Sequence, residues 1–96
     1  MTENVEPLAR AARVSDELIL NITASGNLVV VKTPPGGAQL LASALDRASQ
    51  SGDIKTIIGT IAGDDTVLVI SRNASGGKAL ATELRDFIGG KKARRK

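Results

Sequence analysis

Two apolar runs are joined by the stretch Gly59-Thr60-Ile61-Ala62-Gly63-Asp64-Asp65-Thr66. The runs on either side, residues 56–61 and 66–71, are rich in β-branched side chains, which favour β-strands. Because the link between them is short and contains a glycine, the two runs are predicted to pair as an antiparallel hairpin. Its turn carries two adjacent carboxylates, Asp64 and Asp65.

A second hairpin is predicted earlier in the chain. Over residues 17–23, Leu18, Leu20 and Ile22 occupy alternate positions, which is typical of a strand with one buried face. Residues 24–27 then supply the glycine and asparagine of a turn. The strand predicted at 28–31 consists of β-branched and leucine residues, so the two segments should pair antiparallel.

Each hairpin is followed by a helical segment. From Ala38 the apolar residues recur at helical spacing, and Gly52 is placed to end this helix as a left-handed cap. The last helix is predicted to begin near Ser75 or Lys78 and to end at a pair of glycines. Its expected buried stripe comprises Leu80, Leu84, Phe87 and Ile88.

The predicted order of elements is therefore ββαββα. We predict an α/β (α+β) two-layer sandwich, in which a four-stranded antiparallel sheet carries two helices on one face. A chain of 96 residues suits one domain, which we place at 17–90. Residues 1–16 are expected to be a linker remnant or a short helix, and residues 91–96 a basic disordered tail.

The strands are apolar on both faces, which is unusual for a sheet that is covered on one side only. The continuous runs are Val29-Val30-Val31, Ile57-Ile58 and Val67-Leu68-Val69-Ile70. An apolar patch of this size is seldom left exposed on a monomer, so another subunit is expected to cover it. The alternative is that the runs reflect β-propensity alone.

Several chemistries are excluded by composition. The sequence has no cysteine and no histidine, and so no disulfide, no thiolate metal site and no imidazole base. We therefore predict no catalytic residues and no enzyme. No run is long enough to span a membrane and no signal peptide begins the chain, so a cytoplasmic location is expected.

The positive charge of the chain is concentrated at its C-terminal end. The formal net charge is +3, but residues 91–96 alone carry five positive charges, so the remainder is slightly acidic. Such a tail can contact phosphates, which leaves a small nucleic-acid-binding module as the alternative function. Phe87 is the only aromatic residue, so rings for stacking on bases are missing. We therefore favour a solvated tail.

The acidic turn has an ordinary interpretation and a functional one. Aspartate is common in turns because its side chain binds nearby backbone amides. Two adjacent carboxylates also repel each other unless a cation is near. Gln39 and Asp46 are seven residues apart, so they share one helix face that could adjoin the turn. A guanidinium would pair with such carboxylates in a bidentate way, and Ca²⁺ or Mg²⁺ is the rival ligand. Two aspartates and a glutamine are few ligands for such a metal and the EF-hand spacing is absent, so no metal site is predicted.

These residues carry a family resemblance. The stretch 59–66 resembles the signature of the C-terminal domain of the bacterial arginine repressor family. The segments Thr33-Pro34-Pro35-Gly36-Gly37-Ala38-Gln39-Leu40 and Ala44-Leu45-Asp46 resemble that family's second signature. With the order of strands and helices, the resemblance covers roughly residues 15–88, nearly all of the predicted domain.

The resemblance implies a ligand, an assembly and a set of site residues. Such domains form trimers, and two trimers stack into a hexamer that binds L-arginine as corepressor at the trimer–trimer interface. No other cofactor is implied. The matching ligand-binding positions are Gln39, Asp46, Ala62, Asp64 and Asp65, with the Asp pair reaching in part across to the opposing trimer.

The sequence departs from the family in one respect. The repressors bind operator DNA through an N-terminal winged-helix domain, and residues 1–16 leave no room for one. On its own, the chain is therefore expected to lack specific operator binding. The expected partners are L-arginine and further copies of this chain, and no membrane.

Overall fold

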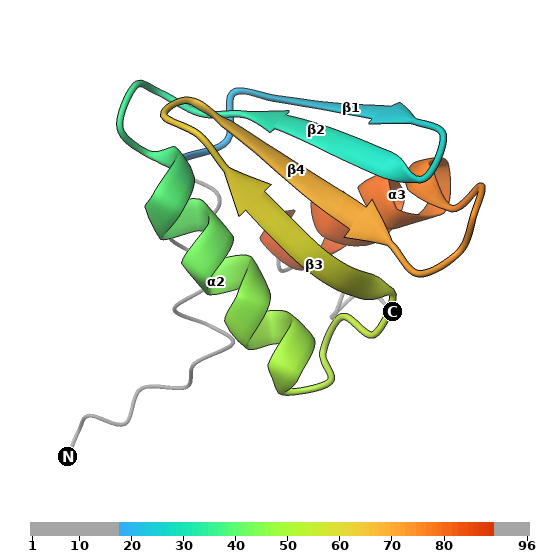
Figure 1. Cartoon of the computed structure of the whole chain (residues 1–96). Coiled ribbons are helices and arrows are strands. Elements are labelled where there is room, and N and C mark those ends of the chain that lie inside the picture. The colour runs from blue at the N-terminus through green and yellow to red at the C-terminus, as the bar shows by residue number, and fades with distance from the viewer. Residues whose placement is uncertain (1–17, 90–96) are drawn as a thin grey trace, which may run out of the picture.

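A computed structural model describes residues 18–89 of the protein (Figure 1). The predictions for residues 1–16 and for the tail at 91–96 lie outside the described residues and stay predictions. The elements follow the predicted order ββαββα. They are β1 (Asn21–Ser25), β2 (Leu28–Lys32), α2 (Ala38–Gln50), β3 (Ile57–Ala62), β4 (Thr66–Ser71) and α3 (Gly77–Gly89).

The four strands form one antiparallel sheet in the order β1-β2-β4-β3. Both predicted hairpins are present, and they join through pairing of β2 with β4. This arrangement makes β1 and β3 the edge strands, and it places the acidic turn between β3 and β4 at one end of the sheet.

Both helices pack on the same face of the sheet. In Figure 1, α2 lies along β3 and α3 lies behind the sheet, where it contacts β1 and β2. Between the layers, alternate residues of the two central strands are fully buried against leucines of the helices. The largest of these buried side chains are Leu41, Leu45, Ile54, Ile57, Leu80, Leu84, Val29, Val31, Val67 and Val69. The predicted α+β fold is confirmed.

The bounds of the first strand were predicted wrongly. The strand begins at Asn21 and continues to Ser25, because the turn uses only Gly26 and Asn27. Gly26 has a φ of 60°, a left-handed conformation that glycine adopts without steric cost. This tight turn pairs Ser25 with Leu28, so the ladder extends further toward the turn than the alternation of apolar residues suggested.

The face of the sheet away from the helices is apolar. Antiparallel partners share a face, so Leu68 of β4 lies between Val30 of β2 and Ile61 of β3. Leu28 and Ile70 form the next pair along the same two central strands. Ile61 is 60% exposed, and the remaining members of this open face are half-buried in the single chain. No helix in residues 18–89 is long and apolar enough to cross a membrane.

Candidate functional site

The acidic turn is attached to the loop that begins α2. The backbone oxygen of Asp64 accepts hydrogen bonds from the amides of Gly36 at 3.0 Å and Ala38 at 3.3 Å. The backbone oxygen of Asp65 accepts one from Thr33 at 2.8 Å. The amides of Gly36 and Ala38, at the entry of the helix, are thus bonded to the turn and are not open to a ligand. These bonds fix the β3–β4 turn against the start of α2.

A groove of about 340 Å³ runs between α2 and β3. Its α2 wall is formed by positions three or four residues apart, which lie on one face of a helix. Its β3 wall is formed by two residues near the end of that strand. The lining residues are Gln39, Ala42, Ser43, Asp46, Arg47, Gln50, Thr60 and Ala62.

Three of the five predicted site residues lie together in this groove. The amide of Gln39 donates a hydrogen bond from Nε2 to the carbonyl oxygen of Ala62 at 3.4 Å. The hydroxyl of Thr60 donates to Oδ1 of Asp46 at 2.8 Å. The predicted helix face therefore does adjoin the hairpin. Within residues 18–89, Asp46 accepts only this bond, so Oδ2 is available to a ligand.

The other two predicted site residues, Asp64 and Asp65, do not line the groove of their own chain. The side chain of Asp64 is exposed, and within residues 18–89 its carboxylate has no hydrogen bond or ion pair. It is therefore free to meet a cation that approaches the end of the sheet from outside.

The Asp65 carboxylate is already occupied. Its Oδ1 accepts a hydrogen bond from Thr66 Oγ1 at 2.9 Å, and its Oδ2 lies 3.6 Å from the Lys32 ammonium. Lys32 in turn donates to Thr66 Oγ1 at 2.7 Å, which closes a small network across β2 and β4. The Thr66 hydroxyl, and then the charge of Lys32, lower the pKa of the Asp65 carboxyl below its ordinary value of 3.8.

Sequence reasoning missed four polar residues of the groove. Ser43, Arg47 and Gln50 lie four, eight and eleven residues after Gln39 along α2. Extending the helical spacing beyond Gln39 and Asp46 would have found them. Thr60 carried no such signal, because only the pairing of the helix with β3 brings it to Asp46.

The groove is polar but poor in metal ligands. No group of three or more acidic side chains that could hold a metal ion gathers in the described part of the chain. Its lining residues include one carboxylate, one guanidinium and several neutral donors and acceptors. Such a lining suits a small zwitterionic molecule better than Ca²⁺ or Mg²⁺, which take six or more oxygen ligands.

The fold and the groove together define a class of protein, a small α+β domain with a polar groove and an apolar sheet face. Residues 15–86 match the family described as "Arginine repressor, C-terminal domain", and the chain belongs to it. This family is regulatory and non-enzymatic, and its domains bind an effector and oligomerise. The resemblance seen in the two sequence signatures is thereby confirmed.

We expect Asp65→Asn to make the thermal stability of the protein less dependent on pH in the acid range. A folded-state pKa below the unfolded one stabilises the protein above the ordinary pKa of 3.8, and this contribution is lost as the pH falls through the lower folded value. The variant should melt slightly below the wild type at neutral pH, and the difference should shrink on acidification. Melting curves recorded across this range test the expectation.

Lys32→Gln is the matching control for this experiment. It removes the ion pair but leaves the Thr66 hydroxyl bond, so it should reproduce part of the effect. If the difference in melting temperature between Asp65→Asn and the wild type stays constant with pH, the network does not lower the pKa of the Asp65 carboxyl.

Proposed function

We propose that this chain is the effector-binding and hexamerisation domain of an arginine-dependent transcriptional repressor of arginine metabolism. L-arginine is the corepressor, and it binds between two stacked trimers. Each site combines Gln39, Asp46 and Ala62 of one groove with the acidic turn, Asp64 and Asp65, of the chains that meet there.

The free carboxylate of Asp64 is the observation that carries this proposal. Asp64 is exposed at the end of the sheet and stands outside its own groove, and its carboxylate has no hydrogen bond or ion pair within residues 18–89. Asp65 is held by Lys32 and Thr66, so Asp64 is the carboxylate of the pair better placed to receive the ligand guanidinium. A guanidinium and a carboxylate make two parallel hydrogen bonds, which favours arginine over lysine.

The groove supports the other end of the ligand. Asp46 offers Oδ2 to an α-ammonium group, and Thr60 holds the carboxylate in place through Oδ1. A single groove thus supplies contacts for the amino-acid end, while an acidic turn from another chain supplies the contact for the side chain. The ligand is then shared between subunits, which couples binding to assembly.

The open face of the sheet supports the trimer. Its centre is Leu68, with Val30 and Ile61 on either side, and the helices leave this face uncovered. Burying apolar surface between subunits stabilises their assembly by roughly 25 cal/mol for each Å² removed from water. Three sheets that face a common axis would bury it.

Calorimetry with L-arginine, combined with light scattering, tests the proposal. We expect heat of binding and a shift from trimer to hexamer, or a hexamer that resists dilution, because a ligand bound at an interface stabilises the assembly by mass action. Citrulline, which has no charge on its side chain, should bind far more weakly. If L-arginine gives no heat of binding at concentrations where the chain is assembled, L-arginine is not the ligand.

A further inference from the structure

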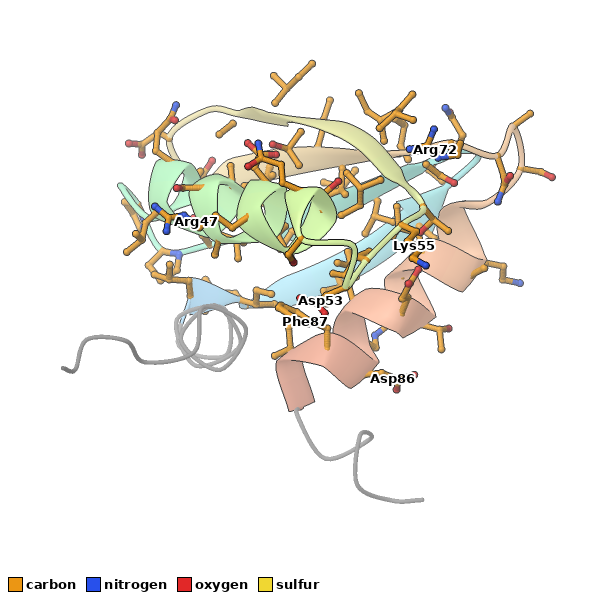
Figure 2. All side chains as sticks on the ribbon, turned by 90° about the horizontal axis from the view of Figure 1, so that it is seen from below. Arg47, Asp53, Lys55, Arg72, Asp86 and Phe87 are labelled. Atoms are coloured by element: carbon orange, nitrogen blue, oxygen red, sulfur yellow. The ribbon has the colours of Figure 1, made fainter. Side chains whose placement is uncertain are left out.

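Among the described residues, 18–89, Arg47 is the one positively charged side chain that lines the groove. It is exposed, and its side chain projects from α2 in Figure 2. Within residues 18–89 its guanidinium has no hydrogen bond or ion pair. The other two arginines described, Arg72 and Arg85, donate to backbone oxygens of Lys55 and Ile22. Arg47 therefore has no structural bond that would account for its place at the groove.

The groove places this cation beside an anion. Asp46 is the residue before Arg47, and successive helix positions point about 100° apart. Asp46 is directed to β3, where Thr60 donates to it, so Arg47 lies on the outer rim of the same groove. The α2 wall of the groove thus carries the negative carboxylate of Asp46, and its rim carries the positive guanidinium of Arg47. This charge pattern is complementary to the α-ammonium and α-carboxylate of a free amino acid.

We infer that Arg47 binds the α-carboxylate of the ligand. It thereby makes the groove select free amino acids over derivatives in which a neutral group replaces that carboxylate. The inference rests on the proposed function, because it assigns the second charge of the same ligand. With the ammonium on Asp46 and the carboxylate on Arg47, the ligand side chain extends out of the groove. Its guanidinium is then directed to the Asp64 of another subunit. Within residues 18–89, Gln39 donates from Nε2 to the Ala62 carbonyl, which leaves its Oε1 for the ligand.

Binding of L-arginine and of L-argininamide to three proteins tests this assignment. L-argininamide keeps the guanidinium and the α-ammonium but replaces the carboxylate with a neutral amide. In the wild type, L-arginine should bind at least tenfold more tightly than the amide. In Arg47→Gln, affinity for L-arginine should fall about tenfold, since hydrogen bonds to charged groups contribute on that order, while affinity for the amide should stay the same. Arg72→Gln removes an equal charge outside the groove and should bind both ligands as the wild type does.

Arg47→Lys provides the second readout. It keeps a cation but loses the bidentate fork, so its affinity for L-arginine should lie between those of the wild type and Arg47→Gln. An equal loss for both ligands in Arg47→Gln would overturn the assignment, as would an unchanged or tighter affinity for L-arginine, or a Lys variant as weak as the Gln variant. A wild type that binds neither ligand would refute the proposed function itself, and the assignment with it.

Discussion

Asp64→Asn should weaken the binding of L-arginine by roughly a hundredfold and leave the trimer intact. Truncating one partner of a charged, hydrogen-bonded pair at an interface costs on the order of 2–5 kcal/mol, and asparagine removes the charge while it keeps the shape. Isothermal calorimetry on the variant measures the loss directly, and light scattering reports the assembly.

The trimer and the fold are expected to survive this change for a structural reason. Asp64 holds α2 through its backbone oxygen, which accepts from Gly36 and Ala38, and the substitution leaves those bonds in place. The side chain makes no hydrogen bond or ion pair within residues 18–89. Asp53→Asn is the matched control, because it removes an exposed carboxylate in the loop after α2, away from the groove. Loss of folding in Asp64→Asn would show that the carboxylate serves the turn and not a ligand.

Leu68→Lys should convert the assembly into monomers that remain folded. Leu68 is the central residue of the open sheet face, between Val30 and Ile61, and it lies outside the core between sheet and helices. Burying an unpaired ammonium in an apolar interface costs on the order of 3–5 kcal/mol for each subunit, which exceeds what one leucine contributes there. The mass measured by light scattering should fall to that of one chain, with an unchanged far-ultraviolet circular dichroism spectrum.

Thr82→Lys is the control for the added charge. Thr82 is exposed on α3, on the helical layer of the molecule, and within residues 18–89 its hydroxyl donates only to the backbone oxygen of Lys78 in the same helix. This variant should keep the mass of the wild type. If Leu68→Lys also retains that mass, the open face is not the surface on which the chains assemble.

The two variants should also differ in their effect on the ligand. Asp64→Asn acts on the ligand and spares the trimer, whereas Leu68→Lys removes the trimer and should lower arginine affinity indirectly. A monomer retains Gln39 and Asp46 but lacks the acidic turn of a second chain. Residual weak binding by the Leu68→Lys monomer would therefore measure what one groove contributes alone.

The sequence predicted most of the elements because their signals are local. β-Branched side chains gave the two strands on either side of the acidic turn, with β4 predicted at its observed bounds, Thr66–Ser71. Gly52, predicted as a left-handed cap, has a φ of 87°. The end of β1 was missed because the turn uses only Gly26 and Asn27, so Ala24 and Ser25 still pair with β2.

For the candidate site, the sequence alone determined the family and indicated which residue types could bind a ligand. Two adjacent carboxylates at 64–65, and Gln39 with Asp46 on one helix face, are readable from residue type and spacing. The tertiary structure decided which of these groups meet. Packing of α2 against β3 brings Asp46 to Thr60 and forms the groove. Pairing of β2 with β4 brings Lys32 to Asp65, so that in the described part of the chain the Asp64 carboxylate alone of the pair has no partner. These contacts join residues 14 and 33 positions apart, and only the folded arrangement of strands and helix specifies them.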